Sequence, residues 1–415
     1  MKRAVVLLLV IPFGNSFGFA GRENNPRFDL LKKIHEGREL LKNESVQLQM
    51  GIVGKRRVRV GRRRYKDVPI TGIVGREMAL AILDAEGNIR VARAIKRNPG
   101  FEVLSPDFIL SMRRENGINS DIACLSPAGG RVVAVKYPIT NDRNRFGPGE
   151  SVIEAVYTPY SAEIKTEDVI KRGIDVKNNF IEKAFARLRD RGVLSRAYSG
   201  KRVVDVIPKD VLRVLLINEH IDPGEFKSPE MAKPLAEQVL TVIGTNHEKA
   251  YAYSISPAGA HGLVQMIPST YSLLLNKYTS AGLRSNFAEA MGDPTNAVMA
   301  QILLCDSDWE AIRARANVAP DKIGPYLAAA YNGGVGRVLT LLSHSDTDWM
   351  ENPDQNSKPT RTVTRKVPVR VRSRSGKVTR RYVVKRYVQP IFRNETSKYV
   401  SQYHWINDFL AARDR

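Results

Sequence analysis

Residues 208–220 read PKDVLRVLLINEH, an apolar stretch of the length and composition of a buried helix. Further helical patterns follow at residues 230–243, 268–278, 293–316, 321–342 and 395–412. Such a run of helices is typical of a compact α domain, in which each helix buries its apolar side chains against the others. The sequence therefore predicts an α domain over residues 201–415.

Glu219 ends the first of these predicted helices and is followed by Ile221, Asp222 and Pro223, where the chain reverses. A carboxyl group placed where packed apolar side chains meet a chain reversal loses hydration, which raises its pKa. A glycosidase needs such a group, because the acid that protonates the leaving oxygen must still hold its proton near neutral pH. Glu219 is the candidate acid, and a solvated or capping Glu is the alternative.

Two further segments have the composition of a sugar-binding cleft. Residues 256–270 read SPAGAHGLVQMIPST, in which small residues let the backbone approach a ligand and Gln265 offers an amide beside apolar side chains. Residues 327–334 read LAAAYNGG, a small-residue helix that ends in an aromatic ring, an amide and two glycines. An ordinary helix with a glycine cap would have the same sequence pattern.

These two segments and ETSKYV at residues 395–400 resemble the three signature segments of the soluble lytic murein transglycosylases, which are relatives of goose-type lysozyme. Their order along the chain is the family's order. Asp293, Pro294 and Asn296 also resemble the helix that the family places between its second and third segments. The resemblance covers about residues 208–412 and implies a lysozyme-like domain that cleaves the glycan strands of peptidoglycan.

The resemblance also implies a role for each matching residue. Glu219 stands where the family has the Glu of a Glu-Ser pair, so it would be the single catalytic acid/base. Ser256 is similar to the hydroxyl that hydrogen-bonds this Glu. The substrate-binding residues implied by the match are Ser256, Gln265, Met266, Tyr331, Asn332 and Glu395.

The catalytic segment departs from the family's pattern in two ways. His220 stands where the family has the Ser of the pair, and 37 residues separate Glu219 from Ser256, which implies an inserted helical segment at about 229–245. The long interval leaves Glu248, eight residues before Ser256, as an alternative catalytic residue. Glu219 is favoured because it follows an apolar helix, whereas Glu248 lies in the polar stretch TNHEK.

The family's reaction implies that Glu219 protonates the oxygen between N-acetylmuramic acid and N-acetylglucosamine, while the substrate's N-acetyl group stabilises the oxocarbenium-like centre. The carboxylate then deprotonates the C6 hydroxyl of the same sugar, which gives a 1,6-anhydro ring without water. Hydrolysis is the alternative outcome and would need a water held by Glu395 or Asp222. No cofactor or metal is expected, because the six histidines lack metal-ligand spacing.

Residues 361–390 interrupt the helical pattern between Tyr331 and Glu395. Val and Tyr alternate there with Arg and Lys on either side of Ser373-Arg374-Ser375-Gly376, which predicts an inserted β-hairpin. This segment has eleven basic and no acidic residues, and residues 55–66 (KRRVRVGRRRYK) have eight basic and none acidic, within a net charge of +22. We expect both segments to bind anionic wall polymers, membrane headgroups or acidic groups of peptidoglycan.

Three alternatives stay open for the basic segments and the domain. Charges also keep an exposed hairpin edge from pairing. Arginine-rich strands with Tyr382 and Tyr387 would suit nucleic acid in a secretion or DNA-transfer component, which an exported location disfavours. His220 and the long insertion would also fit a glycan-binding module without catalysis.

Residues 21–200 are predicted to form an accessory α+β region, so the fold class of the whole chain is α+β. One amphipathic helix is expected within residues 27–50, and short strands from Val68 to Pro138 with one helix at 105–116 (SPDFILSMRREN) that opens at a Ser cap. A turn-rich connector is expected at 139–150 and further helices at 165–198.

Residues 1–20 have the pattern of a secretory signal, with the basic start Met1-Lys2-Arg3, a short apolar run and a small residue at Ala20. The run is far shorter than the ~20 residues that span a bilayer. The sequence therefore predicts export to the periplasm or cell envelope. Cys124 and Cys305 would form a disulfide there or remain as two buried thiols.

Overall fold

A six-stranded antiparallel sheet organises the N-terminal half of the chain. The computed structural model describes residues 28–97, 100–140, 152–222, 224–344, 348–351, 353, 358–372 and 378–413. The strand order is β4-β3-β2-β7-β8, with β1 paired to β2. The bounds are β1 Leu48–Arg59, β2 Tyr65–Leu83, β3 Ile89–Arg97, β4 Phe101–Val103, β7 Arg131–Thr140 and β8 Val152–Tyr157. The predicted signal at residues 1–20 and most of the predicted connector, residues 141–150, lie outside the described residues.

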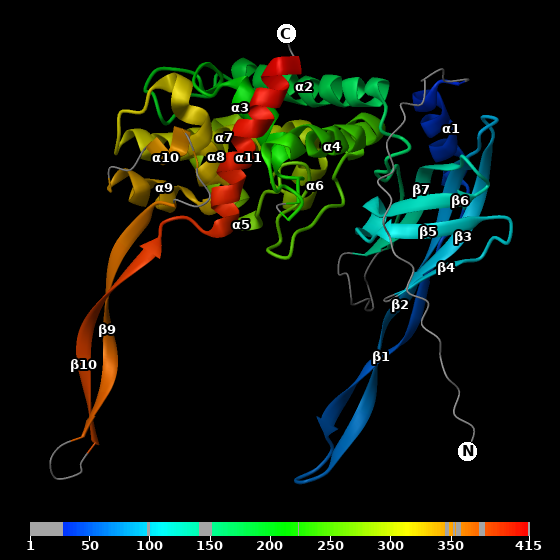
Figure 1. Cartoon of the computed structure of the whole chain (residues 1–415), viewed down its shortest axis with the longest axis horizontal. Helices are drawn as coiled ribbons and strands as arrows, with labels where there is room; N and C mark the ends of the chain where they lie inside the picture. Colours follow the sequence, from blue (N-terminus) through cyan, green and yellow to red (C-terminus); the bar gives the residue numbers. More distant parts are fainter. Residues whose placement is uncertain are drawn as a thin grey trace.

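Each face of this sheet is covered by a different element (Figure 1). Helix α1 (Leu30–Lys42) buries Leu30, Ile34 and Leu41 against β2 and β7. A separate two-stranded sheet of β5 (Ile109–Arg114) and β6 (Asp121–Ser126) belongs to the apolar cluster on the other face. The N-terminal half thus has three layers, which are helix α1, the six-stranded sheet and the small sheet of β5 and β6.

The predicted helix at residues 105–116 is wrong, because residues 109–114 form strand β5, which pairs with β6. Side chains of β5 alternate between exposed and less exposed positions, the two-residue period of a strand. The Ser105 hydroxyl does not begin a helix; its Oγ accepts a hydrogen bond from the backbone N of Arg93, 2.9 Å away in β3. A Ser followed by apolar residues can therefore precede a helix or a strand. Here the Ser hydroxyl accepts from a backbone N–H of the neighbouring strand β3 instead of capping a helix.

The C-terminal half consists mainly of helices that share one apolar cluster. Their bounds are α2 Glu167–Asp190, α3 Lys209–Asn218, α4 Ala232–Asn246, α5 Pro268–Lys277, α6 Phe287–Gly292, α7 Pro294–Arg313, α8 Ile323–Gly333, α9 Val335–Leu342, α10 Asp348–Glu351 and α11 Asn394–Arg413. Single 3-10 turns occupy Gly117–Asn119, Val203–Asp205, Pro229–Met231, His247–Lys249, Thr279–Ala281 and Pro320–Lys322. The chain is thus mixed α and β, as the fold class predicts.

Three details of the helical half differ from the expected ranges. The stretch 321–342 forms two helices, because Gly334 adopts φ +82° between α8 and α9, a conformation that ends a helix. The stretch 165–198 contains the single long helix α2, which buries Phe180, Phe185 and Leu188 in the helical cluster. Because α2 precedes residue 200, the helical core extends across the boundary predicted there.

The sheet and the helical cluster are joined by buried contacts. Asn246 at the end of α4 exchanges two hydrogen bonds of 2.8 Å with the backbone N and O of Thr158, just after β8. Val242 of α4 and Val169 of α2 belong to the two apolar clusters of the sheet. The two halves therefore pack as one unit.

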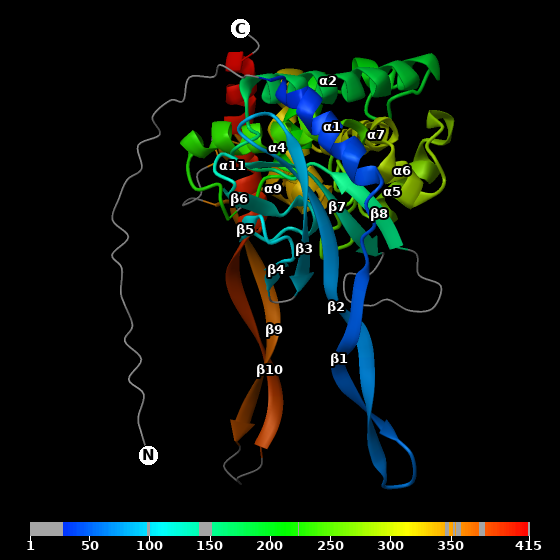
Figure 2. The same ribbon diagram turned by 90° about the vertical axis from the view of Figure 1, so that its right-hand side faces the viewer.

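Two long antiparallel ribbons extend from the same side of the molecule (Figures 1 and 2). The N-terminal arm is the part of β1 and β2 from Ile52 to Thr71. The C-terminal arm consists of β9 (Thr360–Arg372) and β10 (Val378–Pro390), which pair from Arg372↔Val378 to Thr360↔Pro390. Residues 55–66 thus lie in the first arm. The strands of the second arm match the predicted hairpin range 361–390 except that β9 begins one residue earlier, and the predicted turn at 373–376 is outside the described residues.

Cys124 is half-buried in β6 and Cys305 is buried in α7, and both are free thiols.

None of the helices that the structure describes combines the length and apolar character required to cross a bilayer.

Candidate functional site

Glu219 is the C-cap residue of α3, whose residues Leu212, Leu215 and Leu216 are buried in the helical cluster. The helix places the half-buried Glu219 carboxyl against α11, where the hydroxyl of Tyr399 donates a hydrogen bond to Oε1. The neighbouring Asn218 side chain donates from Nδ2 to the backbone O of Tyr399 at 3.1 Å. Two consecutive residues of α3 thus hold the same residue of α11.

The Glu219 carboxyl keeps its proton at neutral pH. Its pKa is raised to about 8, mainly by burial and to a smaller extent by the nearby carboxylate of Glu395. The hydrogen bond from Tyr399 lowers the pKa, because it stabilises the charged carboxylate, but burial outweighs it. A carboxyl in this state can donate a proton to a leaving oxygen near neutral pH.

The segment around Gln265 folds into a tight loop with two isolated antiparallel bridges, Ile255↔His261 and His261↔Met266. Gly262 has φ +73° and lies so close to α6 that a Cβ there would be 2.8 Å from the backbone O of Met291, so only glycine fits. The Gln265 amide donates to the backbone O of Gly262 at 2.8 Å and to Ser254 Oγ at 3.3 Å. Met266 is buried in the helical cluster.

Tyr331 connects this loop with α8 and Glu219. Its hydroxyl donates to the backbone O of Val264 at 2.5 Å. Burial raises the pKa of Tyr331 well above the ordinary value, and the nearby Glu219 carboxylate contributes. The next residue, Asn332, accepts a hydrogen bond of 2.9 Å from Thr396 Oγ1 and so ties α8 to the first turn of α11. Helices α3, α8 and α11 therefore converge on the Glu219 carboxyl.

The remaining predicted residues lie in different environments. Ser256 Oγ accepts from the backbone N of Ala260 at 3.0 Å within its own loop, and among the described residues the hydroxyl on Glu219 is that of Tyr399, not Ser256. Glu395 is exposed in the first turn of α11. Glu248 is exposed in the turn His247–Lys249 and is not part of the group around Glu219.

His220 occupies a fixed structural position beside Glu219. Its ring stacks on Tyr251 with centroids 3.5 Å apart and planes 9° apart, and Nε2 lies 2.8 Å from the backbone O of Leu263, to which it donates. Burial lowers the pKa of His220 to about 4, so the ring is neutral near neutral pH. Tyr251 in turn donates its backbone N to the Tyr157 hydroxyl at 3.2 Å. A line of contacts therefore runs from strand β8 to the residue next to Glu219.

Asp222, a candidate water holder, is engaged by another residue. Arg114 of β5 forms ion pairs with Asp222 at 3.3 Å and with Glu225 at 2.6 Å. Asp222 Oδ1 also accepts from the backbone N of Gly224 at 2.8 Å. The N-terminal half therefore holds the loop that follows Glu219.

Tyr399 and Tyr251 were not identified from the sequence. For Tyr399 a signal exists: it follows Glu395 by four residues in a predicted helix, so the two side chains share a face. Tyr251 lies outside regular structure at φ +57°, and no local pattern pairs it with His220.

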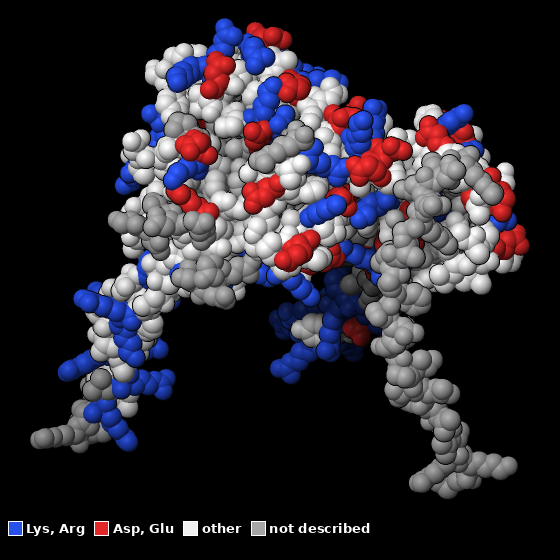
Figure 3. All heavy atoms as spheres, turned by 45° about the horizontal axis from the view of Figure 1, so that its top comes forward, with Lys and Arg blue, Asp and Glu red and all other residues white. Residues whose placement is uncertain are grey.

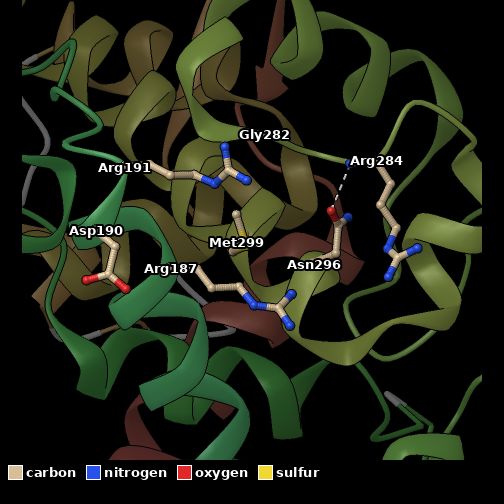
Figure 4. Close-up of a pocket in the computed structure, with 7 residues that line it drawn as sticks. All are labelled: Arg187, Asp190, Arg191, Gly282, Arg284, Asn296 and Met299. Atoms are coloured by element: carbon tan, nitrogen blue, oxygen red, sulfur yellow. Dashed lines mark hydrogen bonds between the residues drawn. The ribbon is translucent and has the colours of Figure 1, made fainter.

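A cavity of about 500 Å³ lies elsewhere, between α2, α7 and the loop before α6 (Figure 4). It is lined by Arg187, Asp190, Arg191, Gly282, Arg284, Asn296 and Met299. The Asn296 side chain is engaged there, since Oδ1 accepts from the backbone N of Arg284 at 3.0 Å and Nδ2 donates to the Tyr271 hydroxyl at 3.0 Å. None of the residues grouped around Glu219 lines this cavity, so it is separate from the candidate site.

Within the ranges that the structure describes, no three His, Cys, Asp or Glu side chains are grouped as metal ligands.

Comparison of the chain with protein-family models, with curated proteins and with solved structures found no match.

Proposed function

We propose that the protein is an exported, lysozyme-like lytic transglycosylase that cleaves the bond between N-acetylmuramic acid and N-acetylglucosamine in peptidoglycan, with Glu219 as its single acid/base. The observation that carries the proposal is the half-buried Glu219 carboxyl, whose pKa of about 8 keeps it protonated. It lies among Tyr331, Tyr399 and Glu395, which belong to the segments that resemble the family.

The proposed chemistry is the reaction that the resemblance implies, with the residues around Glu219 in its roles. Glu219 donates its proton to the glycosidic oxygen as the bond to C1 of N-acetylmuramic acid breaks, and the substrate's N-acetyl group stabilises the positive centre. The Glu219 carboxylate, stabilised by the Tyr399 hydroxyl, then removes the proton of the C6 hydroxyl, whose oxygen bonds to C1. The product carries a 1,6-anhydro ring, and Glu219 regains the proton that it donated.

Turbidity clearing of purified sacculi, followed by mass analysis of the products, tests the proposal. Wild type should clear sacculi and release anhydro ends, which are one water lighter than reducing ends. Glu219→Gln should lose about 10²- to 10⁴-fold in rate, because it cannot transfer the proton. The matched control Glu248→Gln, which alters an exposed carboxyl outside the group, should retain wild-type activity.

Other outcomes would replace the proposal. Products with reducing ends alone would identify a hydrolase, for which the exposed Glu395 is the available carboxylate, since Asp222 is paired with Arg114. Failure of the wild type to clear sacculi that it binds would identify a glycan-binding module. Full activity of Glu219→Gln would refute the site assignment.

A further inference from the structure

The two arms carry most of the protein's excess positive charge. Residues 361–390 contain eleven Lys and Arg and no Asp or Glu, and residues 55–66 contain eight and none. In Figure 3 the C-terminal arm shows Lys and Arg without carboxylates, whereas both signs of charge are mixed over the body. The charge is therefore concentrated on two projections rather than spread over the surface.

The register of β9 and β10 places like charges opposite one another. Arg370 pairs with Arg380, and Arg365 pairs with Lys385. Directly opposed side chains of an antiparallel pair lie on one face ~5 Å apart at Cβ, and like charges there destabilise the ribbon. Anionic groups bound between each pair would remove this repulsion, so the pairs are suited to an anionic partner.

Apolar and aromatic side chains are exposed between these cations. On the half of β10 away from the body, Val378, Tyr382 and Val384 are 58%, 64% and 63% exposed. On the N-terminal arm, Val60 and Tyr65 are 60% and 53% exposed. A dissolved polyanion offers phosphate groups but little apolar volume, whereas the interface of a bilayer accepts cations at its headgroups and valine and tyrosine just below them.

The direction of the arms fits a flat partner. Both point the same way in two views at right angles (Figures 1 and 2). Each strand of the C-terminal arm has 13 residues, which at about 3.3 Å per residue reach ~40 Å. Two arms that point the same way can contact one flat surface at the same time. We propose that the arms dock the protein on an anionic phospholipid bilayer, with their cations at the headgroup phosphates and their exposed valines and tyrosines in the interface.

Co-sedimentation of residues 21–415, the chain without the predicted signal, with vesicles tests this proposal. Wild type should bind vesicles of equal parts phosphatidylglycerol and phosphatidylcholine far more tightly than vesicles of phosphatidylcholine alone, and added salt should weaken binding. Two variants each neutralise four arm cations: Arg365→Gln, Lys366→Gln, Arg370→Gln and Arg380→Gln together, or Arg56→Gln, Arg62→Gln, Arg63→Gln and Arg64→Gln together. Each variant should bind the anionic vesicles on the order of a thousandfold more weakly, at about 1 kcal/mol for each cation removed.

A matched control removes four exposed cations of the body, namely Lys171→Gln, Lys183→Gln, Arg189→Gln and Lys233→Gln, and should bind as wild type does. All proteins begin at residue 21, so the apolar run of the predicted signal contributes to none of the results. The arms project from the body, so the thermal midpoint should be the same in all variants. An equal loss in the body control, or equal binding to neutral vesicles, would overturn the proposal.

A third variant separates a bilayer from other anions. Val378→Ser, Tyr382→Ser and Val384→Ser together leave the charge unchanged, yet should weaken vesicle binding at least tenfold, because these side chains would no longer enter the interface. Binding equal to wild type would refute the insertion. A short DNA duplex that binds more tightly than the anionic vesicles, and displaces the protein from them, would assign the arms to nucleic acid instead.

Discussion

The proton on Glu219 depends on neighbours that act in opposite directions. Burial and the Glu395 carboxylate raise the pKa of Glu219, and the Tyr399 hydroxyl lowers it. In the proposed reaction Glu219 must be protonated to act as the acid, so cleavage of sacculi should hold near neutral pH and fall above about pH 8, where the carboxylate dominates. Tyr399 thus controls the position of the alkaline limb without being the group that titrates.

Tyr399→Phe should move that alkaline limb to higher pH. The substitution removes the hydrogen bond that stabilises the carboxylate, so the pKa of Glu219 rises above about 8. The pH dependence of sacculus clearing measures this. Tyr403→Phe is the matched control, because Tyr403 is buried on the same helix but the hydroxyl that donates to Glu219 is that of Tyr399. This variant should leave the alkaline limb in place. A limb that stays in place, or moves to lower pH, would contradict the account.

At this scale the sequence predicted the environment of Glu219 but not its partner. An apolar helix followed by a chain reversal was sufficient to place the carboxyl at the rim of the core. The partner hydroxyl was assigned to Ser256 by resemblance, whereas the structure has Tyr399, because the packing of α11 on α3 brings together residues 180 positions apart. Contacts at that separation leave no local pattern.

Helices α2 and α4 cross at two glycines, so their backbones are in contact. A Cβ on Gly173 would lie 2.1 Å from the backbone O of Leu240, and one on Gly244 would lie 2.3 Å from the backbone O of Val169. Since backbone atoms cannot turn aside, larger residues must separate the helices. This crossing brings Val242 and Val169 into the apolar clusters of the sheet.

Gly173→Ala and Gly244→Ala should each lower the free energy of unfolding by ~1–3 kcal/mol or more, because the added methyl overpacks the crossing. Urea denaturation measures the change. Gly336→Ala in α9 is the control, since nothing lies within 4 Å of its added Cβ, and it should leave stability unchanged or slightly higher. Equal changes in the free energy of unfolding at all three positions would show that helix propensity, and not the close backbone contact, determines the effect of the added methyl.

At the scale of elements the long helices were predictable and the ambiguous runs were not. The range 293–316 contains α7, because its apolar residues continue for several turns and Asp293 caps its start. ILSMRR at 109–114 is too short to show a helical period, and pairing with β6 makes it a strand. The glycine pair of LAAAYNGG predicted a helix end, which Gly334 forms, whereas the single helical range 321–342 ran across it.

The molecule as a whole should unfold as one unit rather than as two domains divided at residue 200. Residues 201–415 alone lack α2, whose apolar face fills part of the helical cluster, and should show no cooperative thermal transition. The control, residues 28–415, retains both halves and should unfold cooperatively. Calorimetry distinguishes the two chains. A sharp transition for 201–415 would show that the helical half folds without α2.

Two basic arms were only half predictable at this scale. Alternation of Val and Tyr with Arg and Lys predicted a hairpin at 361–390, whereas residues 55–66 were recognised by charge alone. Strand β1 begins at Leu48, shortly after α1 ends at Lys42, and its pairing with β2 extends beyond the basic run, so the pattern within residues 55–66 did not predict a hairpin. Their common direction is a property of the assembled fold (Figure 2).

The root of the C-terminal arm is anchored in the helical body. Strand β10 ends at Pro390, and Phe392 is buried against Trp349 with ring centroids 5.4 Å apart before α11 begins at Asn394. The first turns of α11 carry Glu395, which raises the pKa of Glu219, and Tyr399, which lowers it. A force on the far end of the C-terminal arm would thus act on α11, and through its two side chains on the pKa of Glu219.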